Sequence, residues 1–421
     1  MAMTERLGVL IMYFALVSHV GAVRKVMPVA VPDIFKNKNV AHDKLLPGER
    51  IYNVRSFGAI PDGKSDCTEA FMNAWRATCD STEQARLLVP EGRFLLSSMF
   101  FAGPCSTPEP VTIQVVGTIV APTDLSEYVD SEWLLFEDMD GIKLLGGGTF
   151  DGVGMESWLT ASNCVDIPFG TCIRNPASIY FHRIKNGIIQ NIKSINPKGF
   201  HIFVTNCANI RLRRLKLTAP NESPNTDGIH ISHSIGVRVA KNTIETGDDC
   251  ISIIHGSHQV SVYNVNCGPG HGISIGSLGK YEEELEVKGI RVRNVSMVGT
   301  QNGLRIKTWP DLFPGHASDI IFSDITMQNV RNPIVIDQEY QCSSNCEASL
   351  VQIKNVIFSN IKGTTATPIA VDLRCSNKFP CETIQLENID LSLSLKSKPS
   401  GSRCANIKPI YKGMQNPQGC L

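Results

Sequence analysis

The sequence has no excess of charge of either sign, because its 40 lysines and arginines are balanced by 40 aspartates and glutamates. A protein that binds nucleic acid usually carries a basic surplus, so we expect no nucleic-acid partner. Beyond residue 22 the chain also lacks any apolar run of the roughly 20 residues that a membrane-spanning helix needs. A positive field that attracts an anionic partner must therefore be local to one site.

The sequence also lacks the closely spaced Cys-x-x-Cys pairs that are typical of zinc sites, although it has 14 cysteines. So many cysteines suit an oxidising compartment, where disulfides persist. The number of cysteines does not determine which of them form disulfides with each other. The short-range candidate pairs are Cys164–Cys172, Cys250–Cys267, Cys342–Cys346, Cys375–Cys381 and Cys404–Cys420.

The N-terminus has the features of a secretory signal peptide. Residues 7–17 are apolar and uncharged, and the small residues Gly21 and Ala22 follow at a suitable distance for cleavage. An uncleaved interfacial anchor is the alternative. We interpret residues 1–22 as the signal and residues 23–421 as a single domain of a secreted, monomeric protein, because no linker divides them. Asn294 and, less clearly, Asn221 begin glycosylation sequons.

A degenerate repeat runs through the chain, in which alternating apolar residues are followed by a polar residue and then Ile, Val or Leu. Examples are residues 210–215, 260–265, 290–295, 320–325 and 384–389. Alternation over four to six residues indicates β-strands, and a period of 22–36 residues without helical patterns indicates a solenoid. The hypothesis is an all-β, right-handed parallel β-helix. A leucine-rich repeat is less favoured, because leucine is not periodic.

Two further expectations concern the ends and corners of this solenoid. Residues 68–79 have helical spacing, with Phe71, Trp75 and Cys79 on one face, and predict a short helix that caps the N-terminal end. The asparagines that recur at the polar repeat positions, such as Asn294 and Asn360, predict a buried or half-buried ladder at the turns.

The residues that carry chemistry lie between residues 225 and 307. Asp227, Asp249 and His271 are each separated by 22 residues, which is one coil of a β-helix, so we expect them in register on one face. Asp248 stands beside Asp249. Arg305 and Lys307 are two residues apart, so both side chains point to the same face of a strand.

This pattern predicts a stripe of three carboxylates, one histidine and two cations. Carboxylates so close together repel, so at least one pKa should rise, as a general acid requires. Glycoside hydrolysis needs such an acid and a second carboxylate, and the cations suit the carboxylates of an acidic sugar. A calcium site is the alternative, because clustered aspartates bind hard cations. The adjacent Arg305 and Lys307 argue against it, and we expect no metal and no cofactor.

Four segments resemble the signature blocks of polygalacturonases, in their order, and their wording is similar to that of the plant members. They are SPNTDGIH (223–230), GDDCISI (247–253), GPGHGISIGSLG (268–279) and RIKTW (305–309). The likeness covers most of the chain, from Phe57 to the C-terminal cysteines.

The resemblance implies roles for individual residues. Asp248 corresponds to the general acid, and Asp227 and Asp249 to the pair that activates water. His271 is implied to tune the protonation of the acid. The implied substrate-binding residues are Asn225, Arg305, Lys307 and Tyr340. The family inverts the anomeric configuration and uses no metal, and its pattern implies a Cys250–Cys267 disulfide. The chain departs from the family at Ile254 and His255, where a glycine is usual after GDDCISI.

The resulting hypothesis is a cell-wall enzyme that hydrolyses α-1,4-galacturonosyl bonds of polygalacturonate, with acid and base about 6.5–9.5 Å apart. It leaves internal or terminal cleavage undecided. The alternatives are a hydrolase of rhamnogalacturonan or xylogalacturonan, a calcium-dependent pectate lyase and a non-catalytic protein that binds pectin.

Overall fold

The computed structural model describes residues 48–108, 110–128, 131–161, 175–310, 312–394 and 400–420. All of them belong to one compact unit, formed by residues 41–421. The segment interpreted as a signal peptide and the cysteine pair Cys164–Cys172 lie outside the described residues.

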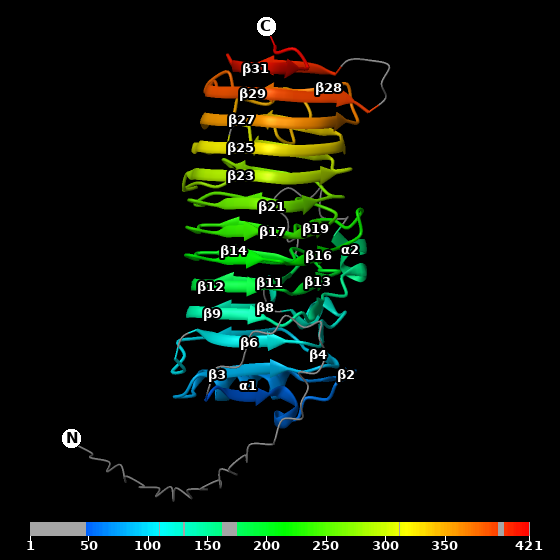
Figure 1. Ribbon diagram of the computed structural model, residues 1–421, viewed down its shortest axis with the longest axis vertical. Helices are drawn as coiled ribbons and strands as arrows, with labels where there is room; N and C mark the ends of the chain where they lie inside the picture. Colours follow the sequence, from blue (N-terminus) through cyan, green and yellow to red (C-terminus); the bar gives the residue numbers. More distant parts are fainter. Residues whose placement is uncertain are drawn as a thin grey trace, which may run out of the picture. The chain divides into compact units, whose positions relative to one another are not determined.

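The described residues form a right-handed parallel β-helix, as the repeat predicted. Each coil places one strand directly above the matching strand of the coil before it (Figure 1). One face of the stack is a parallel sheet that contains eleven strands among the described residues. These are β5 (Met99–Ala102), β8 (Glu132–Glu137), β11 (Ala177–His182), β14 (Ile202–Thr205), β17 (Ile229–Ser232), β20 (Ile251–Ile253), β22 (Ile273–Leu278), β24 (Asn302–Thr308), β26 (Asn332–Asp337), β28 (Ile369–Arg374) and β30 (Gly401–Ala405).

The other strands form a second, bent sheet. In the early coils it has two short strands per coil: β1 (Arg50–Asn53), β2 (Asp62–Asp66), β3 (Ala85–Val89), β4 (Arg93–Leu95), β6 (Val111–Val115), β7 (Thr118–Val120), β9 (Asp140–Leu145), β10 (Thr149–Asp151), β12 (Lys185–Gln190), β13 (Lys193–Ile195), β15 (Arg211–Arg213), β16 (Lys216–Thr218), β18 (Arg238–Ala240) and β19 (Thr243–Glu245). In later coils each pair merges into one long strand: β21 (Ser261–Cys267), β23 (Val287–Val298), β25 (Gly315–Val330), β27 (Val351–Thr365), β29 (Glu382–Leu393) and β31 (Ile410–Asn416).

The bend in this second sheet falls at the polar repeat positions. Asn264, Asn294, Asn360 and Asn388 all have left-handed backbone conformations, with φ between 51° and 54°. Asparagine adopts this conformation more readily than other residues with a side chain. The expected ladder between coils exists, since Asn388 Nδ2 donates to Asn360 Oδ1 at 3.1 Å. The expected burial is wrong for these four asparagines, which are exposed because the bend turns their side chains outward, whereas Asn191 at the same bend is half-buried.

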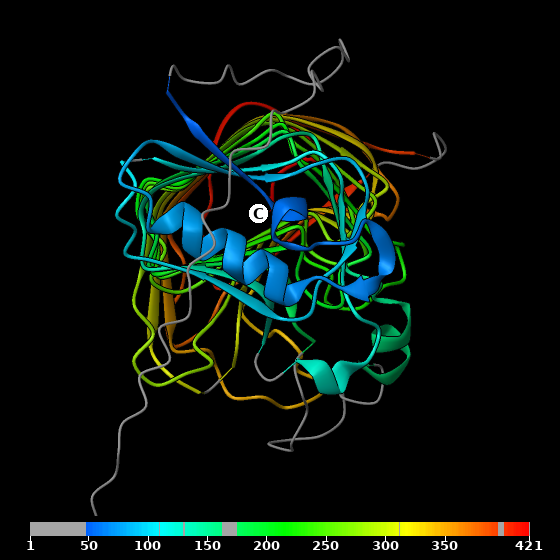
Figure 2. The ribbon, with the colours of Figure 1, turned by 90° about the horizontal axis from the view of Figure 1, so that it is seen from below.

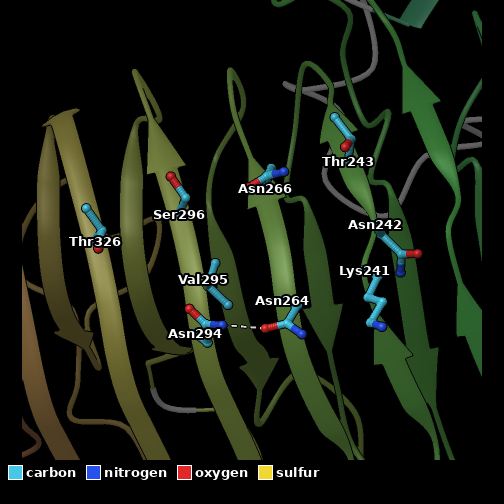
Figure 3. A pocket seen from close by; sticks show the side chains of 9 residues that line it. All are labelled: Lys241, Asn242, Thr243, Asn264, Asn266, Asn294, Val295, Ser296 and Thr326. Atoms are coloured by element: carbon cyan, nitrogen blue, oxygen red, sulfur yellow. Dashed lines mark hydrogen bonds between the residues drawn. The ribbon is translucent and has the colours of Figure 1, made fainter.

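A polar hollow of about 380 Å³ lies along this bend (Figure 3). Asn294 lines it and donates a hydrogen bond to Asn264. Glycosylation at Asn294 and Asn221 stays a prediction.

The core is a set of apolar columns inside the coils. One column runs through the eleven-stranded sheet as Ile229, Ile251, Ile273 and Leu304, all with no exposed surface. Because each residue packs on its equivalent in the next coil, the inward positions of β17, β20 and β22 have no freedom to slide. The residues that flank these strands are therefore held in register as well.

The N-terminal end is capped as expected. The helix α1 (Thr68–Cys79) lies across the end of the stack (Figure 2) and buries Phe71 and Trp75. The ring of Phe71 packs edge-on against Phe94, and Trp75 packs edge-on against Phe101. In the described ranges, the remaining helical segments are α2 (Met155–Ala161) and the short turns η2 (Val54–Phe57) and η3 (Leu125–Glu127).

Four of the candidate disulfides are present, namely Cys250–Cys267, Cys342–Cys346, Cys375–Cys381 and Cys404–Cys420. A fifth, Cys79–Cys105, ties the capping helix to the stack and was not among the candidates. Among the described cysteines, Cys67 and Cys207 are unpaired and buried.

Candidate active site

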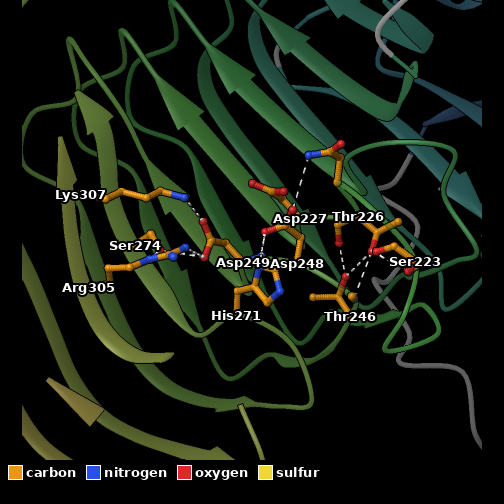
Figure 4. A network of polar contacts seen from close by, with 12 residues as sticks. Ser223, Thr226, Asp227, Thr246, Asp248, Asp249, His271, Ser274, Arg305 and Lys307 are labelled. Carbon is orange, nitrogen blue, oxygen red and sulfur yellow. Dashed lines mark hydrogen bonds and ion pairs between the residues drawn. The ribbon is translucent and has the colours of Figure 1, made fainter. Parts of the chain in front are cut away.

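Three of the predicted residues lie at the starts of consecutive strands. The register of β17, β20 and β22 advances by 22 residues at each step. Asp227, Asp249 and His271 each stand two residues before the first residue of one of these strands, so they lie in line on neighbouring coils. The alignment expected from the spacing is therefore found, and Figure 4 shows the side chains gathered with those of Asp248, Arg305 and Lys307.

Two glycines hold His271 in place. Gly270 and Gly272 have φ values of 133° and 85°, which residues with a side chain rarely adopt. A Cβ at Gly272 would also collide with the backbone oxygens of the next coil. The tight turn directs His271 back toward the preceding coil, where its backbone N–H donates to the carbonyl oxygen of Asp248 at 2.7 Å.

Asp248 is the most accessible of the three carboxylates, with 19% of its side chain exposed. Its Oδ1 lies 2.8 Å from His271 Nδ1 and accepts the backbone N–H of Asp249, also at 2.8 Å. Its Oδ2 accepts a long hydrogen bond of 3.5 Å from Asn225 Nδ2. The carboxyl group is thus oriented through one oxygen, while the other faces outward with a single weak protein contact.

Asp249 is buried, and both of its oxygens are occupied. Oδ1 accepts from Ser274 Oγ at 2.7 Å and from Arg305 Nη2 at 3.0 Å, and Oδ2 accepts from Lys307 Nζ at 3.0 Å. Burial alone would raise the pKa of Asp249, but Lys307 and Arg305 outweigh it and lower this pKa to about 2. Asp249 is therefore ionised at any pH at which the protein is expected to work.

Asp227 is buried and makes no ion pair with a lysine or arginine among the described residues. Burial raises its pKa well above the ordinary value, and the charges of Asp248 and Asp249 raise it further. Its Oδ2 lies 3.2 Å from Nδ1 of His230, whose ring stacks on Phe200. The rise in pKa expected within the cluster falls on Asp227, a member of the pair that the resemblance implies to activate water.

His271 responds to the same charges in the opposite way. Burial disfavours its charged form, but the hydrogen bond and the charge of Asp248, with a further contribution from Asp249, outweigh burial and raise the pKa of His271. A positive charge next to Asp248 is therefore retained to higher pH than in a free imidazole.

The raised pKa of Asp227 has a consequence for stability. The folded protein keeps a proton that the unfolded chain releases above about pH 4, so stability from this group is lost as pH rises through the raised pKa. The loss is about 1.4 kcal/mol for each pH unit between the two pKa values. We expect Asp227→Asn to raise the melting temperature relative to the unmodified protein at about pH 8 by a few degrees, and not at about pH 4.

Differential scanning calorimetry at both pH values measures this effect. The exposed Asp80, changed to asparagine, is the matched control and should give the same small difference at both. An Asp227→Asn difference that does not vary with pH would contradict a raised pKa.

The remaining predicted residues are also close. Arg305 and Lys307 lie on β24, and the ring of Tyr340 is 5.9 Å from Arg305 Cζ and 5.2 Å from Lys307 Nζ. Cations at these distances are attracted to the ring face. The structure therefore brings all eight predicted residues into one site, although Asn225 makes only its single long contact.

Asp248 and Asp249 are close neighbours. A carboxylate oxygen of Asp248 lies within 4.8 Å of one of Asp249, because the two residues are adjacent on a single turn. The separation of about 6.5–9.5 Å between the acid and base groups stays a prediction. Three hydrogen bonds hold the two oxygens of Asp249, so direct attack by this carboxylate on a sugar carbon is disfavoured.

Asp248, Asp249 and His271 each offer one atom that a metal could bind, and these atoms lie within 4.8 Å of one another. Asp249 is already neutralised by Arg305 and Lys307, whose charges would repel a metal ion. The arrangement therefore favours a carboxylate ligand over a calcium ion.

Residues that the sequence argument missed complete the site. Ser274 bridges Asp249 and Arg305, since it donates to the first and accepts from Arg305 Nε at 3.1 Å. Ser274 is the register partner of Arg305, and His230 lies three residues after Asp227. Ser274 could have been found from the sequence, because it occupies the position on its own strand that matches Arg305 on the next coil.

The segment that departs from the family pattern lies away from the carboxylates. His255 follows β20, whereas Asp249 precedes it, and the His255 ring packs on His233 at 4.5 Å between centroids. The substitution therefore alters the turn at the far end of the strand.

The disulfide Cys250–Cys267 supports the turn that carries the acids, because Cys250 directly follows Asp249. Changing both cysteines to alanine should cost about 2–4 kcal/mol of folding stability and also lower turnover. The pair Cys404–Cys420 is a matched control, because its sequence separation of 16 is close to 17. Melting temperature and initial rate measure the two effects. A control that lost as much turnover would show that the first disulfide has no special role.

Comparison with known proteins decides the family. The model of glycosyl hydrolases family 28 matches residues 79–417. The chain belongs to this family. Family 28 membership makes it a glycoside hydrolase.

Two similar proteins are a polygalacturonase from Gossypium hirsutum and an exopolygalacturonase from Arabidopsis thaliana. The first is 44% identical, over 87% of this chain and 89% of its own length. The second is 46% identical, over 86% of each. Among solved structures, the endo-xylogalacturonan hydrolase of Aspergillus tubingensis matches 87% of this chain and 99% of its own, with a TM-score of 0.75 at 25% identity.

Proposed function

We propose that this chain hydrolyses α-1,4-galacturonosyl bonds of polygalacturonate, the acidic backbone of pectin. The main support is Arg305 and Lys307, which both pair with Asp249 within the cluster of three carboxylates, so that an anionic sugar can approach acids that would otherwise repel it. The relatives named polygalacturonase and exopolygalacturonase support the same substrate.

In the proposed reaction, Asp248 protonates the leaving oxygen, and the ionised carboxylates of Asp227 and Asp249 activate water on the opposite face, in a single displacement with inversion. Because its pKa is raised, Asp227 is the stronger base of the pair once ionised and takes up the proton of water. The accessible Oδ2 of Asp248 suits the first role, and the deeper positions of Asp227 and Asp249 suit the second. His271 tunes the acid through its hydrogen bond to Oδ1. Arg305, Lys307, Asn225 and Tyr340 hold the sugar, and no cofactor takes part.

The proposed location is the cell wall, after removal of residues 1–22, with the protein acting as a monomer. Five disulfides support passage through an oxidising compartment. Among the described residues, no helix is sufficiently long and apolar to cross a membrane.

The test is to incubate the purified protein with polygalacturonate and to follow reducing ends and product sizes over time. Immediate release of monomer indicates attack from chain ends, and a ladder of oligomers indicates internal attack. Proton NMR of the first product gives its anomeric configuration, and retention would refute the single displacement.

The same assay separates the alternatives. Absorbance from an unsaturated product, or loss of activity in chelator, would indicate a lyase. Turnover confined to rhamnogalacturonan or xylogalacturonan would change the substrate, and binding without new reducing ends would indicate a non-catalytic pectin-binding protein.

A further inference from the structure

A lysine outside the predicted set stands next to the cationic part of the site. Lys280 lies in the loop of residues 279–286, between β22 and β23. The carboxylate of Glu284 fixes this loop, because it accepts the backbone N–H groups of Gly279, Lys280 and Tyr281 at 2.7, 2.9 and 3.0 Å. Lys280 therefore projects from a rigid support.

The ammonium group of Lys280 rests on two aromatic rings. Its Nζ is 5.1 Å from the centre of the Trp309 ring and 5.6 Å from that of Tyr281. The residue is exposed and makes no ion pair with any acidic side chain in the described part of the chain. Such rings hold a cation in place without neutralising its charge.

The two aromatic residues Trp309 and Tyr340 connect Lys280 to the predicted site. Their ring centres are 5.4 Å apart, and the Tyr340 ring also lies next to the cationic groups of Arg305 and Lys307. The Nε1 group of Trp309 is buried and has no hydrogen-bond partner among the described residues. The three cations thus lie along one continuous aromatic surface.

The positive charge on this surface is only partly neutralised by acidic side chains. Arg305 and Lys307 share Asp249, so together the three groups leave one net positive charge. A chain of acidic sugars carries a carboxylate on every unit, so a second unit on this side needs a second cation. Lys280 supplies this second cation.

We propose that Lys280 binds a second carboxylate of the substrate, on a sugar beyond the one held by Arg305 and Lys307. The ligand is a chain of consecutive unesterified acidic sugars, and a methyl ester at this position loses the contact. The assignment rests on the proposed function and makes Lys280 a residue that determines specificity.

The test compares Lys280→Gln with the unmodified protein on galacturonate oligomers of two to six units. We expect KM to rise about fivefold on the hexamer, the upper end for a solvent-exposed ion pair, and the ratio to shrink as the oligomer shortens. Lys280→Arg should restore most of the affinity, and the ratio should fall with added salt. The control is Lys288→Gln, an exposed lysine on β23.

The outcomes distinguish a failure of the Lys280 contact from a failure of the proposed function. If the unmodified protein turns over polygalacturonate and Lys280→Gln has unchanged KM on every oligomer, this carboxylate contact does not exist. An equal rise in KM at all lengths would likewise overturn it, since the contact lies beyond the first sugar. Absence of turnover by the unmodified protein would refute the proposed function itself, and this assignment with it.

Discussion

Asp248→Asn is expected to lower kcat by a factor of about 10² to 10⁴, the usual range for loss of a general acid. An amide has nearly the same shape and still accepts the N–H of Asp249, but it has no acidic proton to give to the leaving oxygen. KM should change little, because the contacts that hold the sugar carboxylates remain. Initial rates from reducing-end assays measure the effect.

Two controls accompany this variant. Circular dichroism melting should place Asp248→Asn within a few degrees of the unmodified protein, and Asp80→Asn should keep full turnover. Substrates with a better leaving group need less protonation, so on an activated aryl galacturonide the variant should recover part of its rate. Near-normal activity on polygalacturonate would show that another group is the acid.

Lys307→Met is expected to have the second-largest effect, because Lys307 acts on the substrate and on Asp249 together. Breaking a buried ion pair costs about 3–5 kcal/mol when the remaining charge is left alone, and Arg305 and Ser274 keep the loss toward the lower value. We expect kcat/KM to fall at least about 100-fold and the melting temperature to drop by several degrees.

The pH profile distinguishes this explanation from a simple loss of binding. In the unmodified protein Lys307 is the strongest of the charges that lower the pKa of Asp249 to about 2. Without it, Asp249 takes up a proton at higher pH, so the acid limb of kcat/KM should move upward. The exposed Lys354, changed to methionine, is the control. An acid limb that stays in place would show that Lys307 does not govern the ionisation of Asp249.

The sequence carried enough information for the fold because the inward positions repeat without gaps. Ile229, Ile251 and Ile273 follow one another at the coil period, and nothing is inserted between them. The same regularity placed Asp227, Asp249 and His271 in line. Arg305 lies after a longer segment, so its place in the site was expected less directly from the coil period, and its resemblance to a known motif supported it.

The sequence did not show which way a side chain points at a bend of the sheet, or how far apart two side chains lie within one turn. Alternation does not say whether a residue such as Asn294 points inward or outward when the backbone takes a left-handed conformation. The closeness of Asp248 to Asp249 depends on a single turn, and the Cys79–Cys105 pair depends on how the cap folds back. The rise in pKa was expected of the cluster, but its position on Asp227 required knowing which buried carboxylate lacks an ion pair with a lysine or arginine.

The position of β20 within the stack has a consequence for how the protein loses activity. Of the eleven strands described in its sheet, five precede it and five follow it. In a linear array, each layer is held only by its neighbours, so heat opens the two ends first. Fraying of several outer layers would thus leave the catalytic centre intact, and enzymatic inactivation should lag behind the first loss of β-structure on heating.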